Sequence, residues 1–297
     1  DGQLLDSEKA YQRALEINPN SPNVLSNLGA MSIKKGDWDL AATYSRRAIK
    51  LEPNLAEAHN NLAQSLAAIG HYEDAEISYI RAIELNPTYG DAYNNMGNMF
   101  NDSGRLKEAI KSYNKAILFS PNMAEAHNNL GTVNKKLGDF KTALRKYKNA
   151  IALAPGYAEA YNNAGLVYKE LGDYEDAELN LRKAIKLESN YADAHHNLGE
   201  ILASTLRFDE AKHYFMQAVA LKKNLTVASN RLLQLRFNTD DEDGLFSQLE
   251  SLAKKKIRNA VVGSINSRSF LKYGNRKQNL FCEDPLEHVL HINIMSL

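Results

Sequence analysis

The sequence predicts an all-α protein, a right-handed α-solenoid of tandem helix pairs with a C-terminal capping helix and a less regular tail. Three observations predict this fold. A short Asn-containing phrase returns every 34 residues, a Pro returns with the same period, and apolar residues at helical spacing fill the intervals. Repeats of this length bury their cores between neighbours, so the chain grows along one axis instead of around one centre.

The period is set by Asn and Pro. The phrase is clearest at residues 126–131, which read AHNNLG. Its second Asn occurs six times, as Asn27, Asn61, Asn95, Asn129, Asn163 and Asn197. The apolar runs are ended by Pro19, Pro53, Pro87, Pro121 and Pro155. Starting each repeat three residues past the Pro position gives six repeats: 22–55, 56–89, 90–123, 124–157, 158–191 and 192–225. Positions within a repeat are called columns below.

The residue pattern within each repeat predicts two short helices joined by a turn. Apolar residues at helical spacing lie on both sides of the fifteenth column, where a Gly supplies the left-handed residue that ends the first helix. Small residues in the eighth, twentieth and twenty-seventh columns allow the two helices to approach closely. The fifteenth column reads Gly36, Gly70, Gly104, Gly138, Gly172 and, as the exception, Leu206.

The two ends depart from this pattern. Residues 1–21 fit the second helix of a truncated repeat, so we expect further repeats before them. Residues 226–260 fit a degenerate seventh repeat and a capping helix that runs from Leu245 to about Ile257. Residues 261–297 are interpreted as a basic linker and tail, or as the start of a further C-terminal domain. Residues 289–294 within them alternate in polarity as a strand does.

The small-residue and Pro columns resemble the tetratricopeptide repeat family over about residues 1–233. The aromatic seventeenth column of that family is filled by Trp38, Tyr72, Phe140, Tyr174 and Phe208. The resemblance implies that the first helices line a concave groove. The second, sixth, ninth and thirteenth columns share the stripe that faces it, which we call the groove face.

The sixth-column Asn is the candidate binding residue. Asn inside a helix costs about 0.5 kcal/mol relative to Ala, yet it never varies, whereas the ninth column on the same stripe differs in all six repeats. An amide offers both a donor and an acceptor, so a row of amides could hold the backbone of an extended peptide. The alternative, compatible with the first, is that each Asn bonds a neighbouring helix and fixes the repeat spacing.

A row of this kind is similar to the superhelical arm of O-linked N-acetylglucosamine transferases, where the resemblance implies an Asn ladder that holds substrate peptides. The candidate peptide-binding residues are therefore the sixth-column Asn residues and the flanking Asn60, Asn94, Asn128 and Asn162. No glycosyltransferase domain is present. Residues 279–289 resemble the lead-in to 2-oxoglutarate/iron oxygenase domains, but the iron-binding His-x-Asp…His triad is absent.

Composition and spacing exclude several other classes. Lys+Arg and Asp+Glu number 36 each, so no bias toward nucleic acid or a membrane surface exists. The single Cys282 excludes a disulfide framework and a Cys-rich zinc module. His59, His127 and His195 lie two repeats apart and are expected to pack between repeats. We expect no metal, no cofactor and no catalytic residue.

These observations predict a non-catalytic module that binds an extended peptide or protein segment in the groove. Two alternatives remain open: a substrate-recruiting arm of a larger enzyme, either a glycosyltransferase or a 2-oxoglutarate/iron oxygenase, and a structural assembly scaffold. Self-association through the open N-terminal end is a further hypothesis. With no signal-like apolar run, a cytoplasmic location is expected. Acids in the second column, such as Glu57 and Asp91, argue against the clamps that use Lys and Arg to bind a C-terminal carboxylate.

Overall fold

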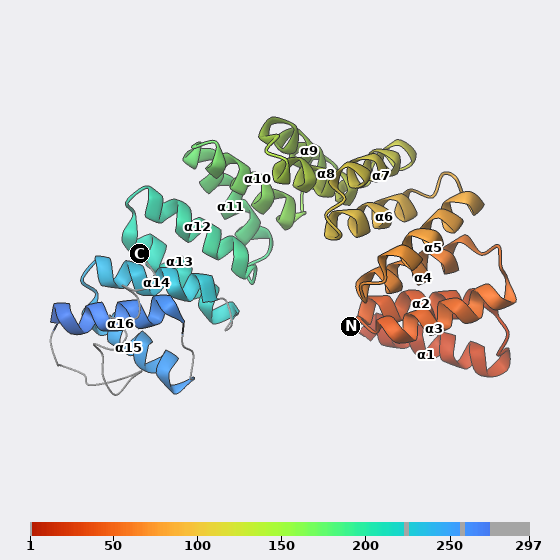
Figure 1. Ribbon diagram of the computed structural model, residues 1–297, viewed down its shortest axis with the longest axis horizontal. Helices are drawn as coiled ribbons and strands as arrows, with labels where there is room; N and C mark the ends of the chain where they lie inside the picture. Colours follow the sequence, from red (N-terminus) through yellow and green to blue (C-terminus); the bar gives the residue numbers. More distant parts are fainter. Residues whose placement is uncertain (1, 223–225, 256–258, 274–297) are drawn as a thin grey trace. The chain divides into compact units, whose positions relative to one another are not determined.

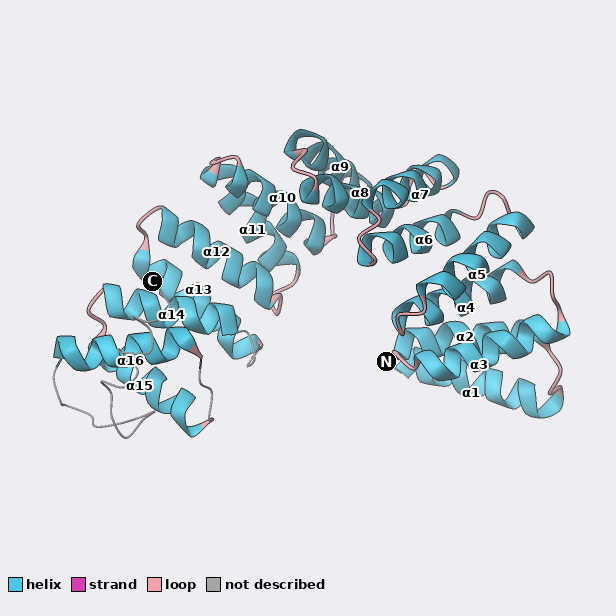
Figure 2. Ribbon diagram, viewed as in Figure 1, coloured by secondary structure: helices cyan, strands magenta, loops and turns pink. Residues whose placement is uncertain are grey.

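The computed structural model describes residues 2–222, 226–255 and 259–273, and in these residues every regular element is a helix (Figures 1 and 2). The chain divides into two compact units, Asp1–Pro155 and Gly156–Leu297. Both consist of antiparallel helix pairs stacked side by side, so the predicted all-α solenoid of tandem pairs is confirmed.

The N-terminal unit begins with one helix, α1, and continues with four pairs. Its helices are α1 (Gly2–Ile17), α2 (Pro22–Lys35), α3 (Trp38–Leu51), α4 (Ala56–Ala68), α5 (Tyr72–Leu85), α6 (Gly90–Asp102), α7 (Leu106–Phe119), α8 (Ala124–Lys136) and α9 (Phe140–Leu153). The even-numbered members are the first helices of the predicted repeats. Each packs against the second helix of its own repeat and, from α4 onward, against the preceding pair.

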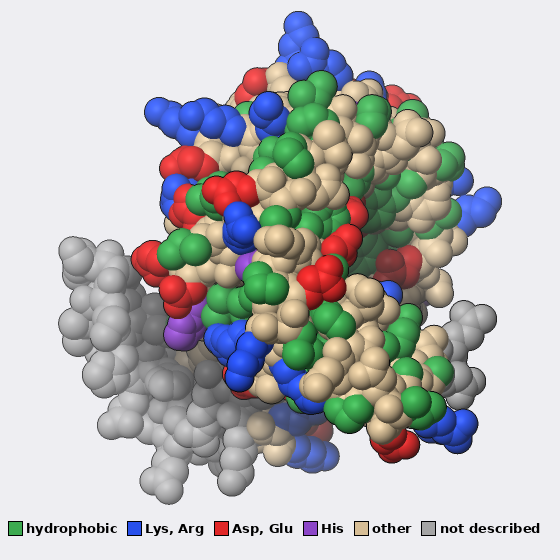
Figure 3. Space-filling view, turned by 90° about the vertical axis from the view of Figure 1, so that its right-hand side faces the viewer, with side chains coloured by type: hydrophobic (Ala, Val, Ile, Leu, Met, Phe, Trp, Pro, Cys, Tyr) green, Lys and Arg blue, Asp and Glu red, His purple; other side chains and the backbone are tan. Residues whose placement is uncertain are grey.

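The C-terminal unit continues the same order. Its helices are α10 (Ala158–Glu170), α11 (Tyr174–Leu187), α12 (Ala192–Ser204), α13 (Phe208–Leu221), α14 (Thr226–Asn238), α15 (Glu242–Lys254) and α16 (Ala260–Tyr273). Lys, Arg, Asp and Glu side chains are interspersed over the face drawn in Figure 3, as the balanced composition predicts.

The turn inside each pair is built by the fifteenth and sixteenth columns. In the first repeat Gly36 has φ 76°, and the two amides after the helix, those of Gly36 and Asp37, donate to Ile33 and Ser32 carbonyls at 2.9 Å. The Asp37 carboxylate then accepts the amide of Leu40 at 3.3 Å and caps the second helix. The predicted left-handed Gly is therefore confirmed. Leu206 takes the same conformation, with φ 63°.

Close approach within a pair depends on the eighth-column Gly. A Cβ at Gly97 would lie 2.6 Å from the ring of Tyr113, and one at Gly131 would lie 2.7 Å from that of Tyr147. Both Tyr rings are almost fully buried. The Gly thus leaves the space in which the twenty-fourth-column ring packs, and the fully buried Ala residues of the twentieth and twenty-seventh columns complete the core.

Residues 260–273 correct one prediction. Residues 261–297 were expected to be a basic linker and tail, but residues 260–273 form α16, which packs on α14 and begins 34 residues after it. Val262, Ile265 and Ser269 form its buried face. The helix was missed because small polar residues such as Ser269 occupy core positions. Residues 289–294, where a strand was expected, lie outside the described residues.

The predicted capping helix corresponds to α15, although it begins at Glu242, before the expected Leu245. The Asp241 carboxylate accepts the amide of Gly244 at 3.2 Å and fixes this start. Apolar residues of α14, α15 and α16 share one core: Leu233, Phe237, Leu245, Phe246, Leu249, Leu252, Val262 and Ile265. α15 therefore occupies the place of a second helix, followed by a further first helix.

Candidate functional site

The sixth-column Asn residues lie on successive first helices. In the N-terminal unit they are carried by α2, α4, α6 and α8, and in the C-terminal unit by α10 and α12. Asn27 is exposed, Asn61 is buried, and the other four are half-buried. The structure thus forms one row of amides in each unit, at the junctions between neighbouring first helices.

The side-chain nitrogen of most of these residues bonds the preceding first helix. Asn61 Nδ2 donates to the Ser26 carbonyl at 3.0 Å. Asn95 Nδ2 donates to Asn60 Oδ1 at 3.2 Å. The recurring bond joins the sixth column of one repeat to the fifth column of the repeat before it.

The same bond is found in both units. Asn129 Nδ2 donates to Asn94 Oδ1 at 3.3 Å and to Asn98 Oδ1 at 3.0 Å. Asn197 Nδ2 donates to Asn162 Oδ1 at 2.8 Å. Such bonds fix the spacing and rotation of adjacent repeats, which was the alternative interpretation of the Asn column.

The flanking Asn residues occupy a different place from the one expected. Asn60, Asn94, Asn128 and Asn162 are each at most 5% exposed. Asn60, Asn94 and Asn162 accept the bonds just described, and Asn94 Nδ2 also donates to Glu125 Oε1 at 3.0 Å. In this structure the fifth column is therefore buried between repeats, and its direct contact with a peptide stays a prediction.

A pocket of about 170 Å³ opens between α4 and α6, beside one of the ladder residues. It is lined by Trp38, Gln64, Ala67, Ala68, Tyr79, Asn95, Asn98, Met99 and Asp102. The lining comes from the ninth, twelfth and thirteenth columns of one first helix and the sixth, ninth, tenth and thirteenth of the next. The twenty-fourth-column Tyr79 and the Trp38 ring complete it.

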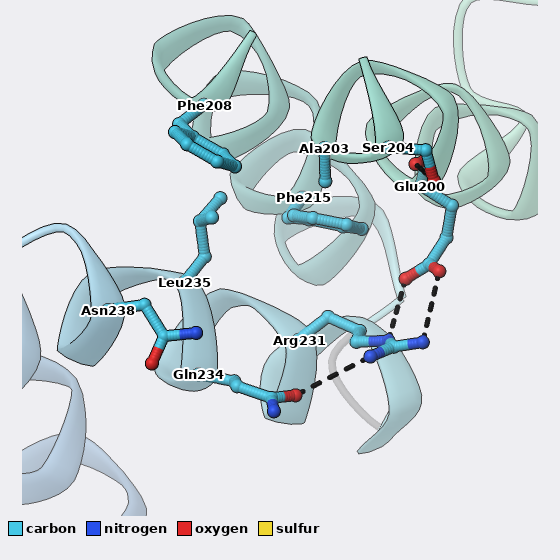
Figure 4. A pocket seen from close by; sticks show the side chains of 9 residues that line it. All are labelled: Glu200, Ala203, Ser204, Phe208, Phe215, Arg231, Gln234, Leu235 and Asn238. Carbon is cyan, nitrogen blue, oxygen red and sulfur yellow. Dashed lines mark hydrogen bonds and ion pairs between the residues drawn. The ribbon is translucent and has the colours of Figure 1, made fainter. Parts of the chain in front are cut away.

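A second pocket, of about 280 Å³, lies between α12 and α14 (Figure 4). It is lined by Glu200, Ala203, Ser204, Phe208, Phe215, Arg231, Gln234, Leu235 and Asn238. All nine stand in the same columns as their counterparts between α4 and α6, but Phe208 belongs to the repeat of α12 itself, whereas Trp38 belongs to the repeat before α4. Arg231 replaces the ladder Asn and pairs with Glu200 through Nε–Oε1 at 2.8 Å and a second contact at 3.2 Å.

Apart from Asn95, the pocket residues were not identified as functional from the sequence. The signal that could have found them is the ninth column, which carries Gln64, Asn98 and Glu200 at equivalent places. In the third repeat Asn98 Oδ1 accepts the hydroxyl of Tyr113 at 2.8 Å. Variation in this column therefore changes the chemistry of each pocket while the architecture stays constant.

The second column gives the groove face an acidic edge. Glu57, Asp91, Glu125, Glu159 and Asp193 are all exposed in the first turn of their helices, where the helix dipole favours them. Burial, together with the nearby Glu57 and Asp91 carboxylates, raises the pKa of Tyr89 to about 12. In each unit this edge therefore presents exposed carboxylates.

The fourth-column His residues bond backbone rather than one another. Nε2 of His59, His127 and His195 lies 2.9, 3.3 and 3.0 Å from the carbonyl oxygens of Pro53, Pro121 and Ser189. Within the described residues no group of three His, Cys, Asp or Glu side chains is placed to hold a metal ion, and none of their helices could cross a membrane. The hypotheses about Cys282 and the final tail concern residues outside the described part.

Comparisons with known proteins agree with the helix-pair repeats described above. Family models described as tetratricopeptide or TPR repeats match residues 10–42, 56–89, 78–111, 97–138, 122–187 and 163–224. A comparison with curated proteins gave no match.

Many solved structures are similar to this chain. The APC/C hetero-tetramer Cut9–Hcn1 matches with TM-score 0.68 and 20% identity, over 76% of this chain and 45% of that chain. PilF of Pseudomonas aeruginosa matches with TM-score 0.62 and 19% identity, over 72% and 97%. YrrB, titled a TPR protein with an unusual peptide-binding site, matches with TM-score 0.47 and 22% identity, over 64% and 97%. At these identities the first two matches establish the fold alone.

Proposed function

Because the chain belongs to the tetratricopeptide repeat family, we propose that it is a non-catalytic interaction module that binds an extended peptide or protein segment along the groove face. The observation that carries this proposal is that three of the sixth-column Asn side chains use their amide nitrogen in a hydrogen bond but not their amide oxygen. Asn95, Asn129 and Asn197 donate through Nδ2, whereas their Oδ1 atoms accept no hydrogen bond within the described residues.

The spacing bond and the binding role support each other in this proposal. An amide whose nitrogen is held by the preceding repeat has a fixed plane, so its oxygen is pre-oriented to accept a backbone N–H. Ordering these side chains adds little further entropic cost on binding. Each hydrogen bond to the peptide contributes about 0.5–1.5 kcal/mol, so the affinity depends on how many sixth-column Asn residues take part. Because these bonds are made to the peptide backbone, the affinity is largely independent of the peptide's side chains.

The test replaces ladder residues and measures peptide affinity. The probe is a set of twelve-residue peptides selected from a random phage-displayed library on the wild-type chain, with dissociation constants measured by calorimetry. We expect the triple variant Asn95→Ala, Asn129→Ala and Asn163→Ala to weaken binding at least tenfold. The matched control is Asn114→Ala with Asn149→Ala, two exposed Asn residues on second helices.

Stability must be followed in parallel, since Asn95→Ala and Asn129→Ala remove spacing bonds. Affinities are therefore compared at a temperature where circular dichroism shows both proteins fully folded. Equal affinities of the triple variant and the wild type would contradict the ladder. They would leave the scaffold hypothesis, in which partners bind elsewhere on the helices.

A further inference from the structure

We propose that the pocket between α12 and α14 is an anchor site that selects a large apolar side chain next to an acidic residue in the bound segment. This inference rests on the proposed function and adds sequence preference to it. It follows from a comparison of the two equivalent pockets, from the charges around Glu200 and Arg231, and from the change in the second column beyond the sixth repeat.

The α12–α14 pocket is larger and less polar at its base than the α4–α6 pocket, about 280 Å³ against 170 Å³. Phe215 stands where Tyr79 stands in the other pocket, so the hydroxyl is absent. Figure 4 shows Phe208, Phe215 and Leu235 on the apolar side, with the Glu200–Arg231 pair opposite. This surface can desolvate a Leu, Met or Phe side chain, and its burial is the main gain.

The charged side of the pocket has an excess of cations. The Glu200 carboxylate, whose side chain is 14% exposed, lies 2.8 Å from Arg231 and 4.0 Å from Lys169 Nζ. One carboxylate thus faces two cations, and the Arg231 side chain remains 51% exposed. Burial lowers the pKa of the nearby His196, so this imidazole is disfavoured as a third cation beside the Glu200 carboxylate. A ligand carboxylate would complete the pairing.

The acidic edge ends at this place. The second column holds an acid from repeat two to repeat six, but in the next two first helices the same column is Val227 and Val261, both exposed. A neighbouring pocket of about 330 Å³ between α14 and α16 is lined by Gln234, Phe237, Ala260, Val261, Ser264, Ile265 and Arg268. Carboxylates are therefore disfavoured along the earlier repeats and accepted here.

The proposed occupant is a partner peptide that carries a large apolar residue beside an acidic one. The pocket lies where the Asn row ends, so this part of the peptide would continue the segment that the row holds. The sixth-column Asn residues would bind the backbone of the peptide. Arg231, which replaces Asn in this column, would instead bind an acidic side chain of the peptide. The pocket would then set the register of the peptide along the row. Charge complementarity of this kind supplies specificity more than total affinity, whereas burial of the apolar side chain supplies most of the affinity.

The experiment repeats the phage selection with the full chain and two pocket variants. Ser204→Trp fills the pocket from an exposed position at the end of α12, and Arg231→Asn restores the ladder residue. Ala68→Trp, at the same column as Ser204 in the second repeat, is the matched control. We expect the wild type to enrich Leu, Met or Phe beside Asp or Glu.

Affinities of one selected peptide and its single substitutions then separate the two contacts. Replacing the apolar residue by Ala should weaken binding to the wild type about tenfold or more, but have little effect with Ser204→Trp. Replacing the acid by its amide should weaken binding to the wild type, but not to Arg231→Asn. Ala68→Trp should keep both preferences.

Several outcomes would overturn the anchor site. Selected peptides without the apolar–acidic pair, with affinities unchanged by Ser204→Trp but lost in the triple Asn variant, would refute it and leave the proposed function standing. Failure of the wild type to select any peptide would refute both. A concentration-dependent dimer abolished by Ser204→Trp, or crosslinks from residues 274–297 into the pocket, would assign it a different occupant.

Discussion

Leu206 carries a backbone conformation that its side chain disfavours. It takes φ 63° at the column where five repeats have Gly, and its side chain is 74% exposed, so no packing compensates for the strain. The amides of Leu206 and Arg207 nevertheless make the bonds that the Gly turns make, to the carbonyls of Ala203 and Leu202 at 3.1 and 2.8 Å. The turn geometry therefore persists without the residue that favours it.

Leu206→Gly is expected to stabilise the protein. A left-handed L-residue costs about 1–2 kcal/mol, and the added chain entropy of Gly offsets about 0.5–1 kcal/mol of that, so the net gain is up to about 1.5 kcal/mol. Urea unfolding would measure it. Gly104, also followed by an Arg, provides the reciprocal variant: Gly104→Leu should destabilise by a similar amount. A loss of stability in Leu206→Gly would show that the Leu side chain has a packing role.

Side-chain identity predicted architecture more completely than it predicted the site. Gly, Ala and Pro columns act through size and backbone conformation, so their meaning could be deduced from the sequence. The partner of Asn129 could not, because the direction of an amide depends on how the next repeat is rotated. The burial of Asn94 and the pocket beside Glu200 follow from the same rotation and became visible only in the structure.

At the scale of the helix, the turn that starts the second helix is stabilised differently in different repeats. Asp37, Asp139 and Asp173 cap it through the amide three residues later. Arg207 instead donates to Glu210 of its own repeat and to Glu178 of the preceding repeat, at 2.7 and 2.6 Å. Each Asp cap stabilises one helix, whereas the Arg207 contacts also connect two pairs.

The connection between first helices by the ladder leads to a stability prediction. Asn129→Ala would leave the buried Asn94 Oδ1 without its donor, which costs about 1–3 kcal/mol. Asn27→Ala should be neutral or slightly stabilising, since Asn27 is exposed and makes no such bond in the described part of the chain, while Ala favours helix by about 0.5 kcal/mol. Urea unfolding of the two variants tests this. Equal changes would mean that the inter-repeat bond contributes nothing.

α16 illustrates how an element can be missed when its pattern is disguised. Its first residue keeps the 34-residue spacing from α14, yet the Gly, Ala and Pro columns are lost. In the sequence, its Lys and Arg residues resemble those of a basic linker. In the structure the Arg268 guanidinium and the Lys272 ammonium each lie 4.7 Å from the centre of the Phe237 ring, so the charges pack against α14.

At the scale of the whole molecule, stability is a sum of pair and interface contributions, so a group repeated along the array affects unfolding more than once. Burial lowers the pKa of both His127 and His196. Each is accommodated as the neutral imidazole, and the ring Nδ1 of both is buried without a partner. Protonation would place an uncompensated charge between helices.

The thermal unfolding midpoint is therefore expected to fall between pH 7.5 and pH 5.5. A His whose folded pKa is depressed binds fewer protons when folded, so stability declines as the pH drops below the unfolded value of about 6.5. The carboxylates with lowered pKa, such as Glu178, act only at more acidic pH, because their unfolded values lie near 4.3. Circular dichroism at the two pH values measures the effect. His127→Tyr, the residue that the chain itself uses at Tyr93 and Tyr161, should reduce the pH dependence while preserving the fold. If the midpoint of this variant shifted as much as that of the wild type, His127 would have no part in the acid sensitivity of the array.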